Sequence, residues 1–483
     1  MLLFGNQALL TDLYQLTMAE GYWREGIGDA RTCFYMHFRE LPFNGGYAIA
    51  CGMSHLAEYV RDFAFTGSDI DYLASIKVQK GEKLFSTEFL HTLKDMRLKV
   101  DIHALSEGTL VFAQEPLVRV SGPVTHCQLL ETALLNIVNF ETLIATKAAR
   151  ICEAAKGPVA EFGLRRAQGP AGGLFASRAA YVGGCASTSN VLAGKHFDIP
   201  VSGTHAHSWV MAFKSELEAF RAYARSFPQN CTLLVDTYDV ISGINNAITV
   251  AHEMSARGES LAAIRIDSGD LAWLSKRARQ MLDDAGLPDV KIVASNDLDE
   301  FAINSLIHEQ ESAIDCWGVG TRLATGDRQP SLGGVYKMCA QWESALGSWI
   351  PKLKVSEQVK KATLPGYLNF RRYHDAHGMI AGDMVYDECH LPTEHRIVDP
   401  FDDLRQKDLN GMAFEEMLKP LVINGKPVNN LASAKDARLN TIANLARLDA
   451  TNKRLMNPHV YPVGLSFELR DCRDDLIRTY KGL

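Results

Sequence analysis

The chain has 483 residues, of which 47% are hydrophobic and 22% charged, a composition typical of a globular protein with two or three domains. Its 50 Lys and Arg against 57 Asp and Glu give a formal charge of −7, which argues against a broad nucleic-acid-binding surface but allows a local basic pocket.

No uncharged apolar run approaches the roughly 18 residues of a membrane-spanning helix. The apolar start at residues 1–14 lacks a basic leader and a cleavage site. The ten cysteines are scattered and form no close CxxC pair, so neither a zinc site nor a disulfide framework is indicated. We therefore expect a cytoplasmic protein with reduced thiols, no membrane association and no nucleic-acid partner.

The first third of the chain has the patterns of an antiparallel sheet followed by a long helix. Residues 32–41 and 99–123 alternate between apolar and polar positions and are broken by Gly and Pro, which indicates strands joined as hairpins. Residues 127–155 carry apolar side chains at three- and four-residue spacing without Gly or Pro. This block predicts one long helix or two in succession.

A repeating rhythm of strands and helices follows. Short β-rich runs end in polar or glycine-containing tips, and helix-like stretches such as residues 213–227 and 272–286 separate several of them. The runs are GPVAEFG (157–163), IPVSGTHAHS (199–208), TLLVDTYD (232–239), LAAIRIDSGD (261–270), VKIVASND (290–297) and IDCWGVGTR (314–322). Six such units predict parallel strands in a barrel or an open doubly wound sheet. Functional groups gather at the carboxyl ends of strands in both folds, so the polar tips form the candidate site.

The rhythm fades beyond about Gly334, where residues 332–343 and 368–388 again have the pattern of strands or hairpins. The tail from Ala432 has a helical pattern, and no low-complexity linker separates these parts. We predict an N-terminal α+β domain at residues 1–125, completed by 345–400, and an α/β domain at 126–344. Residues 401–483 are predicted to form a mostly helical segment packed on the rest.

Two acidic tips are candidates for a metal or ribose site. Asp236 and Asp267 each follow an apolar β run at equivalent positions of successive units, and paired carboxylates suit Mg²⁺ shared with a diphosphate, or ribose hydroxyls. Arg265 lies two residues before Asp267, so on a strand both side chains point the same way and the guanidinium can grip a carboxylate or phosphate. Asp270 either joins this group or caps the following helix.

Other tips offer groups for an anion and a flat ring. In IDCWGVGTR, Gly318 and Gly320 let the backbone turn tightly and Thr321 adds a hydroxyl donor, an arrangement that holds phosphate in late barrel loops but also occurs in plain turns. In EFGLRRAQGP, Phe162 stands near Arg165 and could stack on an anionic heteroaromatic ring, although one of the two arginines there is expected to form a structural salt bridge. Taken by itself, Tyr14 is interpreted as a packing residue of an amphipathic helix.

Two histidines one residue apart, His205 and His207, raise a choice between a metal pair and a single reactive imidazole. On a regular strand both would point the same way, as metal ligands do. A zinc site needs further ligands, however, and no later histidine stands at a strand tip. One histidine acting as a nucleophile or phosphate carrier needs only an exposed imidazole and an orienting partner. We favour one chemical histidine.

Taken together, the motifs closely resemble those of the nicotinate phosphoribosyltransferase family. The matching segments occur in order from about Leu9 to Lys337. They are LLTDLYQLTM, EGTLVFAQEPLVRVSGP, NFETLIATKAAR, EFGLRRAQGPAGGLFAS, STSNVLAG, SGTHAHS, DTYD, RIDSGDL, ASNDLDE, GVGTRLATG and QPSLGGVYK. The departures are small: Ala171 stands where the family often has Asp, and Val240 where Thr is frequent.

The resemblance implies a type II phosphoribosyltransferase fold, in which an N-terminal α/β domain packs on an irregular α/β barrel, here residues 126–344. It implies an enzyme of NAD biosynthesis that joins nicotinate to 5-phosphoribosyl 1-diphosphate, giving nicotinate mononucleotide and diphosphate. ATP hydrolysis is coupled to this reaction and Mg²⁺ is required. The family usually forms a homodimer with active sites at the subunit interface.

The resemblance also assigns roles to individual residues. His207 aligns with the histidine that ATP transiently phosphorylates, whereas His205 occupies a variable position. Nicotinate contacts are implied for Tyr14, Phe162, Thr204 and Arg265, with Tyr14 reaching the neighbouring subunit. Phosphate contacts are implied for Arg165, Gly320 and Thr321, and Asp236 and Asp267 would serve the ribose or the Mg²⁺-diphosphate.

Three rival functions stay open on the sequence. An enzyme of the same fold that prefers nicotinamide would carry an acid in the STSN region and lack GTxAHS. A metal-dependent barrel hydrolase would use the HxH pair as zinc ligands. A non-catalytic nucleotide sensor is disfavoured because every proposed catalytic position carries a competent side chain.

Overall fold

A computed structural model describes residues 7–355, 363–428 and 431–482 of the chain. The chain separates into two compact units, of which unit 1 is Met1–Leu143 with Ser331–Leu483 and unit 2 is Ile144–Pro330. The boundaries therefore differ from the predicted 125 and 344. The reason is pairing and packing: residues from Gly334 onward pair with an N-terminal strand, and the first turns of the helix Glu131–Ala154 bury apolar side chains in the unit 1 core.

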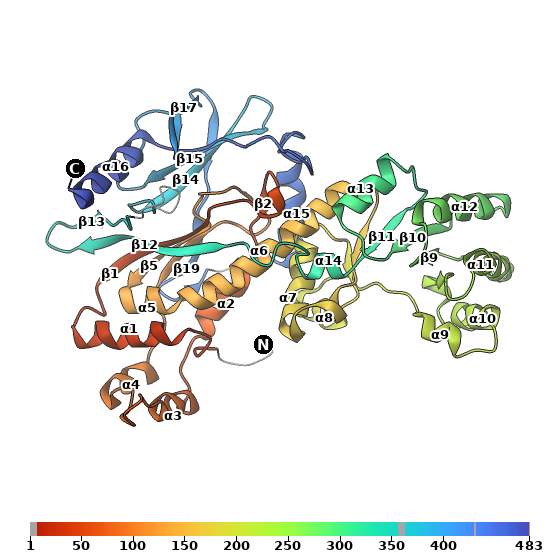
Figure 1. Ribbon diagram of the computed structural model, residues 1–483, viewed down its shortest axis with the longest axis horizontal. Coiled ribbons are helices and arrows are strands. Elements are labelled where there is room, and N and C mark those ends of the chain that lie inside the picture. Colours follow the sequence, from red (N-terminus) through yellow and green to blue (C-terminus); the bar gives the residue numbers. More distant parts are fainter. Residues whose placement is uncertain (1–6, 356–362, 429–430, 483) are drawn as a thin grey trace. The chain divides into compact units, whose positions relative to one another are not determined.

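Unit 1 is built on an antiparallel sheet of seven strands in the order β13-β12-β1-β5-β3-β19-β20 (Figure 1). Strand β1 pairs with β12 on one side and β5 on the other, and seven of its eight residues are buried because both faces of the sheet are covered. The strands are β1 (Arg31–Phe38), β3 (Asp101–Ala104), β5 (Val118–Pro123), β12 (Gly334–Glu343), β13 (Ser348–Pro351), β19 (Lys419–Ile423) and β20 (Lys426–Pro427). The predicted antiparallel sheet over residues 32–41 and 99–123 is confirmed.

A second sheet of unit 1 has six strands in the order β17-β16-β21-β15-β14-β18, and a two-stranded ladder joins β2 (Ala48–Ile49) to β4 (Leu110–Val111). The hairpin of β14 and β15 in the six-stranded sheet confirms the strands predicted in residues 368–388. The strands are β14 (Leu368–His374), β15 (Ile380–Asp387), β16 (Arg396–Asp399), β17 (Asp402–Asp408), β18 (Ala413–Glu416) and β21 (Val463–Leu465).

The helices of unit 1 cover these sheets and enclose one large apolar core, which includes Phe38, Leu56, Phe89, Val120 and Leu134. The block predicted as one or two helices forms two in succession, α5 (Val124–Leu129) and α6 (Glu131–Ala154). The other helices are α1 (Leu13–Arg24), η1 (Pro42–Asn44), α2 (Met53–Asp62), α3 (Gly67–Ser75), α4 (Thr87–Lys94), α15 (Ala434–Ala446) and α16 (Phe467–Lys481).

The expectation of a mostly helical segment at residues 401–483 is wrong. Besides α15 and α16 this segment contains strands β17 to β21. Strand β17 is the edge of its sheet and reads DDLRQKD, with six of seven residues exposed. Charged residues are common on edge strands because they discourage further pairing, and they erase the alternating pattern that would reveal a strand.

Unit 2 contains a parallel sheet of six strands in the order β7-β6-β11-β10-β9-β8. The strands are β6 (Val159–Glu161), β7 (Ser187–Thr188), β8 (Thr232–Leu234), β9 (Ala263–Ile266), β10 (Lys291–Ser295) and β11 (Cys316–Val319). Five of the six predicted runs supply these strands. The run at residues 199–208 instead contributes a single parallel bridge between Val201 and Thr188, and the sixth strand is β7.

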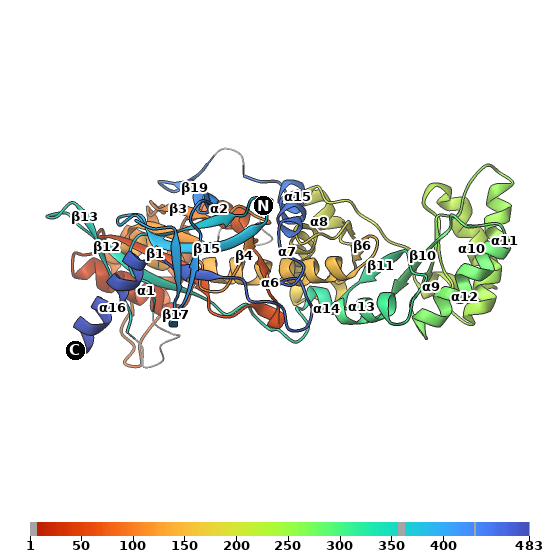
Figure 2. The same cartoon turned by 90° about the horizontal axis from the view of Figure 1, so that it is seen from above.

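Helices follow most of these strands. Helices α10 (Glu216–Ser226), α11 (Val240–Ser255) and α12 (Leu271–Asp284) lie beside one another (Figures 1 and 2). Helices α11 and α12 contact β9, α12 also contacts β10, and the three helices bury Phe220, Ile244 and Leu274 in one core with the strands. The helices are η2 (Leu164–Arg166), α7 (Gly169–Val182), α8 (Val191–Phe197), α9 (His207–Met211), α10 (Glu216–Ser226), η3 (Pro228–Asn230), α11 (Val240–Ser255), α12 (Leu271–Asp284), α13 (Glu300–His308) and α14 (Thr321–Ala324).

Aspartate caps explain where three helices of unit 2 begin. The carboxylates of Asp239, Asp270 and Asp299 accept backbone N–H groups in the first turns of α11, α12 and α13. Asp270 is therefore a helix cap, which settles the choice that the sequence left open.

Two further findings concern the whole described chain. No helix within residues 7–355, 363–428 and 431–482 has the length and apolar character needed to cross a membrane. None of the ten cysteines, all of which lie in those ranges, forms a disulfide.

Candidate active site

The carboxyl ends of five neighbouring parallel strands carry most of the residues singled out in the sequence. Phe162 directly follows β6, Asp267 directly follows β9, and Asp236 comes two residues after the end of β8. Gly320 and Thr321 follow β11, and Ser295 ends β10. Because parallel strands end on one edge of their sheet, these side chains share one face of unit 2.

Arg265 is the centre of a polar network at this edge. Its Nη1 donates to Oγ1 of Thr204 at 2.9 Å, its Nε to Oγ of Ser295 at 2.9 Å, and its Nη2 to Oδ1 of Asp267 at 3.0 Å. Ser295 also donates to Asp267 in a short hydrogen bond. A guanidinium has five N–H groups, so three bonds fix its plane and leave two for a ligand, counting only the residues that the structure describes.

Phe162 stands over the same guanidinium, with its ring centre 5.7 Å from Cζ of Arg265. The ring has room because position 318 is glycine: a Cβ there would lie 2.7 Å from the Phe162 ring and 3.3 Å from Cβ of Ser295. The predicted function of Gly318 as a turn residue is therefore corrected, since it lies inside β11 and makes space for an aromatic side chain.

A cavity of about 190 Å³ lies within unit 2, where Phe162 and Thr204 line it near the carboxyl ends of the strands and Pro158, Thr232 and Cys316 line it near the amino ends. An apolar cavity of about 150 Å³ is large enough to hold benzene. The space therefore suits a ligand of one aromatic ring, with a ring face on Phe162 and a hydroxyl on Thr204.

Asp236 and Asp267 lie side by side. Oδ2 of Asp236 accepts the backbone N–H of Asp267 at 3.0 Å and the hydroxyl of Ser268 at 2.6 Å. The other oxygen, Oδ1 of Asp236, is buried and has no hydrogen-bond partner among the described residues. A buried carboxylate oxygen without a donor is a candidate ligand for a cation, because it is otherwise costly to desolvate.

The two neighbouring histidines have separate environments. His205 is buried against Phe220 and Tyr223, and its Nε2 accepts the backbone N–H of Leu234 at 3.2 Å. Burial lowers the pKa of His205 to about 4, so its imidazole is neutral at physiological pH. With Nε2 engaged and the ring enclosed, His205 is not a metal ligand, and the alternative of a metal pair is excluded.

His207 is the first residue of α9 and its side chain is 43% exposed. Its Nδ1 lies 3.2 Å from Oγ1 of Thr237, and its Nε2 lies 3.9 Å from Oδ2 of Asp267. His205 and His207 do not lie on a regular strand, the arrangement in which both would point the same way, because the chain has left the sheet after Val201 and begins a helix at His207. An exposed imidazole with an orienting hydroxyl remains a candidate nucleophile.

Glu161, which the sequence did not single out, organises the loop that carries Phe162 and Arg165. This buried carboxylate accepts the hydroxyls of Ser177 at 2.9 Å and Thr188 at 2.6 Å, and a short hydrogen bond from the backbone N–H of Gly163. Its only sequence signal was an acidic residue in an otherwise apolar strand.

Arg165 follows in the short helix η2 and is exposed, as is Arg166. Neither has an ion pair or hydrogen bond within the described residues, so the expected structural salt bridge of one of them is absent there. Thr321 is also exposed and opens α14 directly after Gly320. These groups are accessible to a phosphate.

Two other features escaped the sequence patterns. Asn296 and Asp297, directly after Ser295, have positive φ angles of 109° and 40°, a strained backbone of the kind found at functional sites. Glu216 is buried at the start of α10, where burial and the nearby carboxylates of Asp239 and Asp236 raise its pKa.

Tyr14 lies in unit 1, on α1, and its side chain is half exposed. Burial, followed by the charge of Glu131, raises the pKa of its phenol. Its contact with nicotinate in the neighbouring subunit stays a prediction.

Among the described residues, one group of metal-ligating types is close enough to share an ion, namely Cys51, Glu107 and Glu141 in unit 1. Glu107 accepts the N–H of Gly52 and the hydroxyl of Ser54, and Glu141 contacts Nδ1 of His55 at 2.9 Å. These contacts describe a hydrogen-bonded polar network rather than a metal centre.

Comparisons with known proteins point in one direction. Three protein-family models match the sequence. They are the nicotinate phosphoribosyltransferase (NAPRTase) N-terminal domain over residues 9–139, the NAPRTase family over 158–341, and the NAPRTase C-terminal domain over 369–473. Nicotinate phosphoribosyltransferase of Bacillus subtilis (strain 168) is 43% identical over 479 residues, covering 96% of this chain and 93% of that protein. The Caenorhabditis elegans protein of that name is 36% identical, over 96% of this chain and 92% of its own length.

Solved structures agree. The crystal structure of human nicotinic acid phosphoribosyltransferase superposes with a TM-score of 0.83 and 32% identity, covering 96% of this chain and 99% of that one. A nicotinate-nucleotide pyrophosphorylase from Pyrococcus furiosus has a TM-score of 0.69 at 22% identity, over 91% of this chain and 95% of that one, and shares the fold. The predicted α/β fold with an N-terminal domain is thereby confirmed.

Proposed function

Because the chain belongs to the nicotinate phosphoribosyltransferase family, we propose that it joins nicotinate to 5-phosphoribosyl 1-diphosphate in NAD biosynthesis. The products are nicotinate mononucleotide and diphosphate, and ATP hydrolysis is coupled to the transfer. Cytoplasmic location and a homodimer with shared active sites belong to the same proposal.

The observation that carries the proposal is the network of Arg265. A guanidinium held by Thr204, Ser295 and Asp267 has two N–H groups left, and the ring of Phe162 faces it at 5.7 Å. Nicotinate is a flat pyridine ring with a carboxylate. The ring stacks on Phe162 while the carboxylate binds Arg265 and Thr204, which pairs each part of the substrate with a complementary group.

The reaction needs positioning and charge rather than a strong base. The pyridine nitrogen attacks the anomeric carbon with its free lone pair, and the bond from that carbon to the diphosphate oxygen breaks as the new bond forms. Positive charge develops on the ribose ring, and Asp236 and Asp267 lie at the strand ends where carboxylates would favour it. Holding the ring at the correct angle supplies much of the rate.

The same two carboxylates fit a Mg²⁺ ion. The donors are hard carboxylate oxygens, and the buried Oδ1 of Asp236 lacks a partner among the described residues. Mg²⁺ would neutralise charge on the diphosphate leaving group. Arg165, Gly320 and Thr321 would hold the phosphate of the ribose, since Arg165 and Thr321 are exposed and carry hydrogen-bond donors.

His207 is proposed as the site of ATP-dependent phosphorylation. With its Nδ1 proton donated to Thr237, the lone pair of Nε2 attacks the γ-phosphorus of ATP, and the bond to the ADP oxygen breaks. The phosphoryl group adds negative charge beside Asp267. This added charge orders the site for a Mg²⁺-bound sugar diphosphate. Tyr14, on an exposed face of α1, is proposed to complete the active site of the neighbouring subunit.

The deciding experiment measures nicotinate mononucleotide formed from nicotinate and 5-phosphoribosyl 1-diphosphate, with and without ATP, and repeats it with nicotinamide. We expect product from nicotinate, stimulated by ATP, and far less from nicotinamide. Absence of product, or a preference for nicotinamide, contradicts the proposal.

A second measurement isolates the histidine. His207→Ala should abolish ATP stimulation and acid-labile labelling by γ-phosphate-labelled ATP, while slow transfer without ATP remains. His252→Ala, an exposed histidine on α11, is the matched control and should behave as wild type. Full ATP stimulation in His207→Ala would refute the assignment.

A further inference from the structure

A groove of about 800 Å³ opens in unit 1 and shares no residue with the strand ends of unit 2. Its walls come from residues 39–46, 112–114, 397–407 and 454–463, so segments far apart in the sequence converge on it. This volume lies within the range of about 300 to 1,000 Å³ that is typical of small-molecule sites.

The groove is strongly basic although the chain as a whole is acidic. The residues that line it include Arg39, Arg405, Lys407 and Arg454 against one carboxylate, Asp399, while Glu40, Asp402 and Asp403 lie next to the lining in the chain; the full chain has a formal charge of −7. Like charges that converge on a concave wall raise the local positive potential, which attracts anions. A binding site for an anion explains the pattern.

The hydrogen-bonding capacity of these cations is largely unused. Nε of Arg39 is enclosed and has no partner, and Arg454 has neither an ion pair nor a hydrogen bond, within the described part of the chain. Arg405 forms an ion pair with Asp402, at 3.5 Å between two exposed side chains. Nζ of Lys407 donates to the carbonyl oxygen of Ala381 at 2.7 Å. The side chains of Arg405 and Arg454 are exposed, so their N–H groups are accessible to an anion in the groove.

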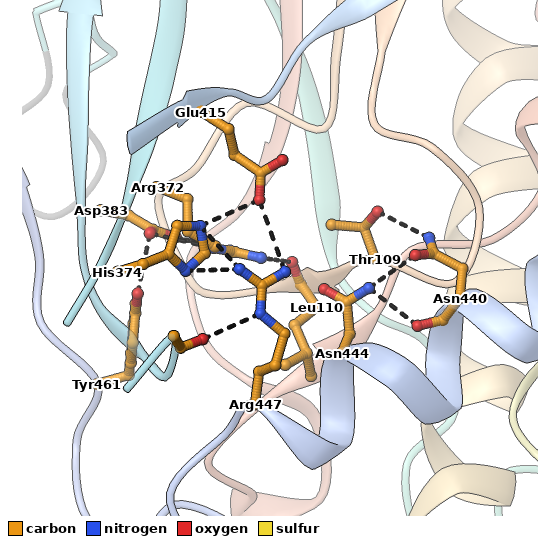
Figure 3. Close-up of polar contacts among 11 residues, drawn as sticks. Thr109, Leu110, Arg372, His374, Asp383, Glu415, Asn440, Asn444, Arg447 and Tyr461 are labelled. Atoms are coloured by element: carbon orange, nitrogen blue, oxygen red, sulfur yellow. Dashed lines mark hydrogen bonds and ion pairs between the residues drawn. The ribbon is translucent and has the colours of Figure 1, made fainter. Parts of the chain in front are cut away.

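The floor of the groove is held rigidly. The rings of Phe112 and Tyr461 stack with centres 3.8 Å apart, and the Tyr461 hydroxyl donates to Oδ1 of Asp383 at 2.9 Å. Asp383 is paired with Arg372 at 2.6 Å, and Arg372 also donates to the carbonyl oxygen of Leu110 (Figure 3). A fixed floor lowers the entropy lost when a ligand binds.

The backbone around the groove is strained as well. Gln114 and Asn457, both in its walls, have positive φ angles of 73° and 46°, and Phe43 and Asn44 have φ angles of 60° and 48°. Position 46 must be glycine, because a Cβ there would lie 2.1 Å from the carbonyl oxygen of Asn452. Strained conformations that the surrounding structure maintains are common at ligand sites.

We propose that this groove is a second ligand site that binds a small polyanion with two or more linked phosphate groups. The guanidinium groups of Arg39 and Arg454 make the main contacts, and Arg405 adds charge at the rim. Arginine forks match phosphate oxygens in geometry, and a chain of linked phosphates brings enough negative charge to balance the wall. No residue that lines the groove belongs to unit 2.

The test uses inorganic tripolyphosphate with the full-length protein, and hydrogen exchange measured by mass spectrometry locates the bound anion. We expect slower amide exchange in residues 39–46, 112–114 and 454–463, reported separately from any change in unit 2. Arg39→Gln/Arg454→Gln should weaken binding in the groove about tenfold or more, because charge-assisted hydrogen bonds are lost. The exposed single change Arg454→Gln should weaken it less and guards against misfolding of the double variant.

Arg97→Gln is the matched control, since Arg97 is an exposed arginine of unit 1 outside the groove. It should bind tripolyphosphate as wild type does. Unchanged affinity in the double variant, or no protection of the groove segments, overturns the proposal. Protection by ATP equal to that by tripolyphosphate supports recognition of the phosphate chain, whereas protection by ATP and adenosine but not by tripolyphosphate overturns it.

Discussion

Oδ2 of Asp236 accepts the backbone N–H of Asp267 at 3.0 Å. One acidic strand end thus fixes the backbone of the next, and the other oxygen of Asp236 stays buried without a partner among the described residues. The pair is therefore held in place before any cation or sugar diphosphate arrives.

The first prediction concerns the charge of that pair. Asp236→Asn keeps an oxygen for Asp267 but removes the negative charge, so we expect kcat to fall on the order of 100-fold. Binding of Mn²⁺, followed by electron paramagnetic resonance, should weaken in parallel. Asp239→Asn is the matched control, because Asp239 caps α11 and asparagine caps equally well. Wild-type Mn²⁺ binding by Asp236→Asn would rule out the proposed metal role.

The second prediction concerns the space that Gly318 leaves for the ring of Phe162. Gly318→Ala places a methyl group where the ring now lies, 2.7 Å away, so the ring must shift. We expect kcat/KM for nicotinate to fall roughly 100-fold, since small displacements in a site have large effects on rate. Gly67→Ala, at an open position of α3, should leave kcat/KM unchanged. A wild-type kcat/KM in Gly318→Ala would show that the ring does not position the substrate.

The third prediction follows from the buried imidazole of His205. Its pKa is about 4 in the fold against an ordinary value near 6.5, so the unfolded chain binds the proton more tightly. The stability that neutral His205 contributes is present above pH 6.5 and is lost as the pH falls toward 4, with a slope of up to about 1.4 kcal/mol per pH unit. His205→Gln should flatten this part of the stability profile, measured by urea unfolding between pH 4 and 7.

A companion variant tests the hydrogen bond to Leu234. His205→Leu leaves the backbone N–H of Leu234 without its acceptor, so we expect it to lower the free energy of unfolding at pH 7 by about 1 to 3 kcal/mol. Glutamine can replace the Nε2 acceptor and should be milder. Equal stability of both variants with wild type at every pH would contradict the structural role of His205.

The fourth prediction concerns Glu216. Burial and the carboxylates of Asp239 and Asp236 raise its pKa, so the fold holds this proton more tightly than the unfolded chain does. Ionisation of Glu216 therefore reduces stability as the pH rises through and above the ordinary carboxyl range. Glu216→Gln keeps an acceptor for Asn246 and should raise Tm at pH 8 more than at pH 4.

Glu218→Gln serves as the control for this prediction, since it changes an exposed carboxylate two residues away on the same helix. It should leave the pH dependence of Tm unchanged. A lower Tm for Glu216→Gln at pH 8 would mean that its charge is stabilising and would contradict the sign argued here.

The strand–helix rhythm of residues 157–322 predicted a parallel sheet, and that sheet exists with five of the six expected strands. It also placed Asp236, Arg265 and Asp267 on neighbouring strand ends, because apolar runs of four or five residues followed by polar tips leave little choice of register. The match of motifs to one family drew on these segments and on others from Leu9 to Lys337.

Only the tertiary structure separated His205 from His207, since period-two reasoning holds only while the chain stays in a strand, and here it leaves the sheet after Val201. Ser295, Glu161 and Glu216 gain their importance from partners that lie between 16 and 30 residues away in the chain. The sequence by itself determined which segments are strands and which tips are polar, because these depend on local periodicity. The structure decided which polar atoms are enclosed, paired or left without a partner, because burial depends on contacts between segments that no local pattern records.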